Sequence, residues 1–204
     1  MESDIILKSM GEKKRMLLHA CCAPCSSASL EYLTEYFDID IFFFNPNIET
    51  KKEFEKRLSE LNRFVEEYGF SRKINIFVGD YDHEEFLREV KGFEDAVEGG
   101  ERCVKCFAER LSRTADLAAE KGYDYFATTL TISPLKNADV LNRLGLSFEK
   151  KGDVLYFPTD LKKKGRYQRS IELSKQYGLY RQDYCGCEFS RKAREKAKND
   201  ENHD

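Results

Sequence analysis

No apolar run in the sequence approaches the ~20 residues that a membrane-spanning helix needs. The N-terminus, MESDIILKSMGEKKR, has acidic residues early and only a very short apolar patch. It matches neither a signal peptide nor a transit peptide, so we expect a cytosolic protein with no membrane partner. Tryptophan is absent and only three glutamines occur, a composition that leans toward a thermophilic source.

Internal repeats, low-complexity linkers and domain boundaries are also absent from the 204 residues. Of these residues, 41% are apolar and 35% charged, as in a soluble globular protein with a sizeable core. We expect one catalytic domain over residues 1–190 and a polar, frayed tail over 191–204. The formal charge of −3 does not indicate non-specific nucleic-acid binding, although a local basic patch would still permit it.

Short apolar runs alternate with helical patterns along the chain. This alternation predicts an α/β fold with a parallel sheet flanked by helices. We expect strands over 15–20, 39–45, 73–79, 123–129 and 153–158, and helices from Ser26 or Ser27 and over 51–69, 83–90, 103–121, 138–146 and 166–178. Ligands of such folds bind beyond the carboxyl ends of the strands, where Cys21, Cys22, Thr128 and Thr129 fall.

Seven cysteines form three groups: Cys21-Cys22-x-x-Cys25, Cys103-x-x-Cys106 and Cys185-Gly-Cys187. Cytosolic thiols are kept reduced, so clustered cysteines there indicate metal binding or redox chemistry rather than a disulfide scaffold. Cys103 and Cys106 share one face of a helix at its first turn, where thiolates are favoured. Four thiolates from two such groups satisfy tetrahedral zinc or an iron–sulfur cluster.

Two alternatives stay open on the residues alone. A structural zinc in a non-catalytic RNA-interaction module would use four of the seven cysteines, and a thiol-disulfide oxidoreductase would use one reactive pair. The Cys185-Gly-Cys187 spacing closes a strained ring if it is oxidised, and strained disulfides tend to be redox-active.

Five segments, LLHACCAPCS, FFFNPNI, GERCVKCFAERL, TTLTISPLKN and LYRQDYCGCEFS, together resemble the QueH-type epoxyqueuosine reductases, which do not use cobalamin. The resemblance runs from about Arg15 to Ser190. It implies reduction of epoxyqueuosine to queuosine at the wobble position of tRNA, a [4Fe-4S] cluster, and an additional iron nearby. It also implies a fold similar to the PP-loop nucleotide-binding domains, without the use of ATP because cysteines replace the glycine-rich phosphate loop.

Carried over by motif, the resemblance assigns the cluster to Cys21, Cys22, Cys103 and Cys106, and the redox pair to Cys185 and Cys187. Cys25 either replaces Cys22 or is a buried structural thiol. The electron donor is unidentified.

Acid groups near these motifs are candidates for two further roles. Asp183 or His19 would protonate the leaving oxygen, although a strand histidine is more often a satisfied structural residue. Asp183 or Asp80 would be a carboxylate ligand for the additional iron, although a surface or capping role is the more common one for such residues.

A tRNA substrate requires contacts to bases and phosphates. Asn45 and Asn47 are expected to hydrogen-bond a base edge, with a simple turn as the alternative. Lys136 is expected to meet a phosphate. The best basic patch lies around Tyr167, with a solvated charge run as its alternative; it comprises Lys162, Lys163, Lys164, Arg166 and Arg169.

Overall fold

A computed structural model describes residues 6–7, 11–150 and 154–201. Five parallel strands form one sheet in the order β3-β2-β1-β4-β5. The strands are β1 (Lys14–His19), β2 (Phe37–Phe43), β3 (Ile76–Val78), β4 (Tyr125–Thr128) and β5 (Leu155–Tyr156). The predicted single α/β domain is confirmed, whereas the likeness to PP-loop domains stays a prediction.

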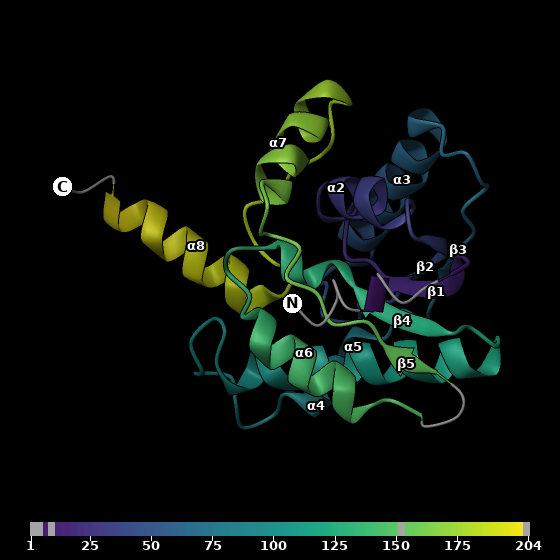
Figure 1. The fold of residues 1–204 in the computed structure, drawn as a ribbon. Coiled ribbons are helices and arrows are strands. Elements are labelled where there is room, and N and C mark those ends of the chain that lie inside the picture. Colours follow the sequence, from purple (N-terminus) through teal and green to yellow (C-terminus); the bar gives the residue numbers. More distant parts are fainter. Residues whose placement is uncertain (1–5, 8–10, 151–153, 202–204) are drawn as a thin grey trace.

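Helices cover both faces of this sheet (Figure 1). One layer contains α2 (Ala23–Leu33), α3 (Lys51–Tyr68) and α7 (Arg166–Gln176). The other contains α4 (His83–Glu89), α5 (Glu101–Glu120) and α6 (Ala138–Ser147), and a short 3-10 helix, η1 (Thr129–Ile132), follows β4. Within the described ranges, no helix is both long and apolar enough for a membrane span.

The start of the first helix differs from the sequence expectation. The first helix begins at Ala23 rather than at Ser26 or Ser27, with Cys22 at its N-cap. Pro24 stands in the first turn, where its fixed φ suits a helix, and both serine hydroxyls instead donate to carbonyls of the preceding turn. The polar C-terminal segment forms α8 (Glu188–Glu201), which projects away from the sheet in Figure 1. The frayed tail over 191–204 stays a prediction.

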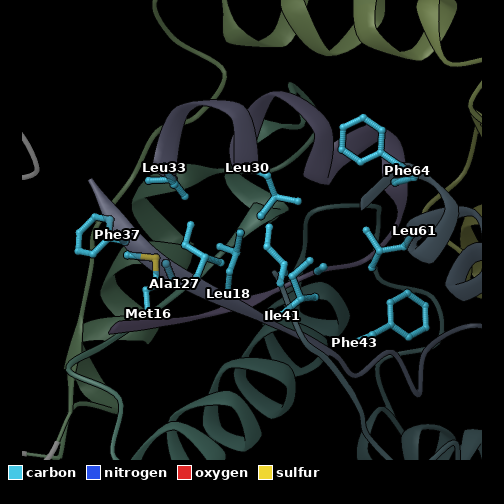
Figure 2. Close-up of a cluster of buried hydrophobic side chains, with 14 of the residues drawn as sticks. Met16, Leu18, Leu30, Leu33, Phe37, Ile41, Phe43, Leu61, Phe64 and Ala127 are labelled. Atoms are coloured by element: carbon cyan, nitrogen blue, oxygen red, sulfur yellow. The ribbon is translucent and has the colours of Figure 1, made fainter. Parts of the chain in front are cut away.

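The main core lies between the sheet and the α2–α3 layer. Figure 2 shows Leu30 and Leu33 of α2 and Leu61 and Phe64 of α3 facing apolar residues of the central strands. Leu18 and Ile41, on neighbouring strands β1 and β2, have no exposed surface. These side chains fix the central strands against α2 and α3, and thereby fix the strand ends that carry the functional residues.

A buried carboxylate, Asp40, connects β2 to the segments that precede β3 and β4. Its oxygens accept hydrogen bonds from the Asn75 backbone N–H (2.9 Å), the Tyr123 hydroxyl (2.7 Å) and Arg72 (3.2 Å). Burial alone would raise the pKa of Asp40, but these hydrogen bonds outweigh it and hold the pKa below its usual value.

Replacing Asp40 by Asn should lower the free energy of unfolding at pH 7 by about 1.5–3 kcal/mol, because hydrogen bonds to a charged acceptor are lost. A folded-state pKa below the unfolded value stabilises the protein above the unfolded pKa of about 3.9, and this contribution is lost as the pH falls through the folded pKa. Urea unfolding of both proteins from pH 7 to pH 2 measures it. A difference that does not shrink in acid contradicts the assignment.

Candidate functional site

The strand order places β1 between β2 and β4, and the chain leaves β1 and β4 toward opposite faces of the sheet. This divergence opens a crevice at the carboxyl ends of the two strands, the usual binding position in such sheets. His19 ends β1 and is paired in register with Thr128, the last residue of β4. Cys21 and Cys22 follow directly after β1, so the first cysteine group stands at this crevice.

The first group brings three thiols together. Sγ atoms of Cys21, Cys22 and Cys25 all lie within 4.8 Å of one another, a spacing that would hold a metal ion. Cys21 and Cys22 are buried, with 3.7 Å between their sulfur atoms. Cys22 is the N-cap of α2 (φ −174°, ψ 164°), so the short distance between the two sulfur atoms falls where the chain turns from β1 into this helix.

The second group sits at the start of α5. Cys103 and Cys106 occupy its first turn and the residues directly after, one helical turn apart. The Gly99 N–H lies 3.2 Å from the Cys103 sulfur, and Nη1 of Arg110 lies 3.9 Å from the Cys106 sulfur. Both thiols therefore already receive donors of the kind that stabilise sulfur ligands.

The third group is a tight turn between α7 and α8. Sγ atoms of Cys185 and Cys187 are 3.4 Å apart, and the Ser190 N–H lies 3.4 Å from the Cys187 sulfur. Gly186 has φ 122°, and a Cβ there would come within 3.0 Å of Ile48 and 3.1 Å of Arg57. Glycine is thus required both by conformation and by space.

Two adjoining cavities connect the three groups. The first, of about 290 Å³, is lined by Cys21, Cys22, Cys25 and Cys185. The second, of about 20 Å³, is lined by Cys103, Cys106, Cys185 and Cys187. Cys185 and Lys136 line both. The structure therefore gathers all seven cysteines, from three distant segments, around one composite site.

Within the first and third groups the thiols differ in acidity. Hydrogen bonds from Cys22 and Cys25 lower the pKa of Cys21, whereas the pKa of Cys22 is raised to about 12. The hydrogen bond from Cys187 and the charge of Lys136 lower the pKa of Cys185 to about 5. The pKa of Cys187 is raised, first by its bond to Cys185 and then by burial. These two groups therefore each contain one thiol that ionises readily, whereas in the second group burial raises the pKa of both Cys103 and Cys106.

A network of hydrogen bonds around the buried Arg110 guanidinium lies next to the cysteine groups. Arg110 donates through Nε to His19 Nε2 (3.2 Å) and through Nη2 to Asn45 Oδ1 (2.5 Å), besides its contact with Cys106. The Asn45 Nδ2 donates in turn to the Ala20 carbonyl (2.9 Å). One guanidinium thus connects β1, the loop after β2 and α5.

His19 does not fit the role of proton donor. The ring is fully buried, with Nδ1 3.0 Å from Thr128 Oγ1 and Nε2 accepting from Arg110 Nε at 3.2 Å. Burial, followed by the charge of Arg110, lowers its pKa to about 3. The imidazole is neutral and both nitrogens are engaged, so its role is structural, the alternative named above.

The two expected base-binding asparagines differ. Asn45 is fully buried, and both of its polar atoms are used inside the protein, so it offers nothing to a base. Asn47 is 2% exposed and lines the second cavity, where its Oδ1 has no hydrogen-bond partner among the described residues. Only Asn47 is free to contact a bound group.

The two candidate carboxylates, Asp183 and Asp80, line different cavities. Asp183 lines the first cavity and pairs with Lys198 at 2.5 Å, a contact that lowers its pKa. It is therefore a carboxylate at neutral pH, which suits a metal ligand better than an acid. Asp80 lines a different, acidic cavity with Asp82 and Glu85, where none of the cysteines lies.

Most charges of the expected basic patch are already paired. Lys162 and Lys163 contact Asp160 at 2.8 and 3.0 Å, and Arg169 contacts Glu31 at 2.7 Å. The Arg166 guanidinium lies over the Tyr32 ring, 4.3 Å from its centroid. Tyr167, in contrast, does line the first cavity, as does Lys136.

Sequence reasoning missed other residues that line the first cavity, namely Arg57, Arg181, Tyr184 and Arg194. The sequence did contain a signal that Arg57 is a buried or functional residue. It stands between Phe54 and Leu61 at helical spacing, so a charged residue interrupts the buried stripe of α3. A charge at such a position indicates a buried partner or a site.

Comparison with known proteins agrees with this site. The family profile described as "Epoxyqueuosine reductase QueH" matches residues 16–193. Relatives with the same description include a Streptococcus pyogenes serotype M1 protein, 44% identical over 87% of this chain and 70% of the relative. A Staphylococcus epidermidis protein is 42% identical over 88% of this chain and 77% of the relative. A Thermotoga maritima protein is 38% identical over 86% of this chain and 89% of the relative.

The Arg110 network predicts the effect of an asparagine substitution. Asn45→Ala leaves Nη2 of Arg110 buried without an acceptor and should lower the free energy of unfolding by about 1–3 kcal/mol. Asn62→Ala is the matched control, because its side chain bonds only the Leu58 carbonyl at an exposed position; we expect a change within about 0.5 kcal/mol. Equal losses in denaturant unfolding contradict a special role for Asn45.

Proposed function

The chain belongs to the epoxyqueuosine reductase QueH family of oxidoreductases, and from this premise we propose that it reduces the epoxide of epoxyqueuosine to queuosine in tRNA. The wobble nucleotide of the anticodon loop would be the substrate, and the cytoplasm the location. The observation that carries the proposal is the convergence of three cysteine groups on two adjoining cavities at the strand ends.

The donor set fits a [4Fe-4S] cluster, which requires thiolate ligands. We propose that Cys21, Cys22, Cys103 and Cys106 hold it, supported by the 3.7 Å spacing of the first pair and by the donors on the second. Cys25 lies within 4.8 Å of the first pair and is the alternative ligand. When bound, the cluster supplies one-electron transfer. Arg57, Arg110 and Lys136 offset the negative charge that its thiolates bring.

An additional iron would require an oxygen ligand beside sulfur. Asp183 fits this role, because it lines the first cavity as a carboxylate. Asp80 does not, because its side chain lines the separate acidic cavity.

Cys185 and Cys187 are proposed as the redox pair. Their sulfur atoms are already 3.4 Å apart, so closing the S–S bond requires little movement. Oxidation of the dithiol releases two electrons and two protons. Reduction of the epoxide to the alkene consumes two electrons and two protons and releases the oxygen as water, so the two half-reactions balance. An external electron donor must then reduce the disulfide.

Substrate contacts are proposed at the first cavity. Its walls include Tyr167 and Tyr184, which would offer aromatic faces to a base lying beside the cluster. Lys136, Arg181 and Arg194 would meet the flanking phosphates. This places the main RNA contacts at the cavity mouth rather than on the paired charges of residues 162–169.

Iron and acid-labile sulfide in anaerobically purified protein test the cofactor. We expect about four of each per chain, together with conversion of epoxyqueuosine to queuosine in tRNA. Cys103→Ser should lose the cluster, and Cys25→Ser should keep it if Cys22 is the ligand. Zinc without sulfide would contradict the proposal and support the structural-zinc alternative.

Serine variants of the redox pair separate chemistry from cofactor binding. Cys185→Ser and Cys187→Ser should retain iron and sulfide yet lose turnover by at least about 100-fold, because the two-electron dithiol couple is gone. Queuosine formation in tRNA, measured over multiple turnovers, checks this. Full activity in either variant would contradict the assignment of Cys185 and Cys187 as the redox pair. Loss of the cluster in a variant would instead indicate that the replaced cysteine is a cluster ligand.

A further inference from the structure

Arg57 is a buried cation at the boundary between α3 and the composite site. It is 2% exposed and lines the first cavity. Its Nε donates to Glu53 Oε1 at 2.7 Å, and Glu53 also accepts from the Tyr180 hydroxyl at 3.2 Å. The guanidinium is therefore held in one orientation from α3 and from the segment after α7.

The same guanidinium holds the turn of the redox pair. Its Nη1 donates to the Cys185 carbonyl at 2.9 Å. Close by, the Glu49 N–H donates to the Gly186 carbonyl at 3.0 Å. Because a Cβ at Gly186 would lie 3.1 Å from Arg57, the turn and the side chain are in close contact. Arg57 thus helps to determine where Cys185 stands relative to the cavity.

One nitrogen of the Arg57 guanidinium has no hydrogen-bond acceptor in the part of the chain that the structure describes. This nitrogen is Nη2, and it is buried. A buried charged donor is normally satisfied, and Arg110, at the opposite side of the site, has an acceptor for Nε, Nη1 and Nη2. The cavity that Arg57 lines is the space shared by Cys21, Cys22 and Cys25, so a bound anionic group there would supply the missing acceptor.

We infer that Arg57 is a positioning residue with two separable actions: Nη1 tethers the Cys185 turn, and the free Nη2 donates to the anionic group held by the thiols of the first cavity. The inference rests on the proposed function, in which that group is the iron–sulfur cluster. The tether keeps the two sulfurs of the redox pair together, and the positive charge stabilises the reduced, more negative state of the cluster.

Two variants separate the actions. Arg57→Gln removes the positive charge and the planar set of guanidinium donors. Arg57→Lys keeps the charge but cannot donate to Glu53 and to the Cys185 carbonyl at the same time. Arg63→Gln is the control, because Arg63 lies on the same helix and bonds Glu60, Glu67 and the Tyr177 and Gly178 carbonyls, but does not line the cavity or bond the Cys185 turn. Iron and sulfide content and thermal unfolding are measured for all four proteins.

The midpoint potential of the reconstituted cluster, from an anaerobic titration followed by absorbance, reports the charge. We expect Arg57→Gln to lower the reduction equilibrium constant about tenfold, or about 59 mV for one electron. Arg57→Lys and Arg63→Gln should stay within about twofold of wild type. A midpoint in Arg57→Gln within twofold of wild type overturns the donor role.

The thiol–disulfide equilibrium of cluster-free protein in glutathione buffers reports the tether and requires no cofactor. Cys185 and Cys187 lose two electrons and two protons as they form a disulfide, and glutathione disulfide is reduced to two thiols. We expect both Arg57 variants to disfavour the protein disulfide about tenfold, or about 30 mV, with Arg63→Gln unchanged. An unchanged equilibrium overturns the tether. Failure of wild type itself to bind iron and sulfide refutes the proposed function instead.

Discussion

The hydrogen bonds of the Arg110 guanidinium are the constraint on which the site depends. This buried cation joins His19 at the end of β1, Asn45 after β2 and Cys106 on α5. These residues lie up to 91 positions apart in the chain, yet they meet behind the thiols. A buried charge is tolerated only when its donors are satisfied, so the three elements must keep this relative arrangement for the fold to be stable.

Around Arg110, positively charged side chains lie among the cysteine thiols of the site. Seven thiols line the two cavities, and Arg57, Arg110 and Lys136 stand among them. Burial alone would lower the pKa of Lys136, but the thiolates of Cys21, Cys25 and Cys185 outweigh it and raise the pKa. The cations and the thiols therefore favour each other's charged forms, so thiolates, the form that binds metal, are favoured in the site.

Periodicity predicted the parallel sheet, most of its helices and the position of Cys21 and Cys22 at the strand ends, whereas the joining of the other cysteines to them was implied by the family resemblance. Local sequence patterns could not reveal which polar side chains are already hydrogen-bonded inside the folded protein. Asn45 and His19 look like functional residues in sequence, but Arg110, far along the chain, engages both. The basic run at 162–169 looks like a free surface because Glu31, the partner of Arg169, lies 138 residues away. For His19, Asn45 and Arg169 a long-range contact decides the role.

The three cysteine segments also set the order in which the site can be completed. Cys21 and Cys22 belong to the first strand–helix unit, Cys103 and Cys106 to the middle of the chain, and Cys185 and Cys187 to the turn that Arg57 and Glu49 hold against α3. During synthesis, the first cavity lacks one wall until residues 181–187 have emerged and docked. The enclosed site is consequently completed late in synthesis, and a nascent chain stalled before Cys185 presents its earlier thiols without the wall that encloses them.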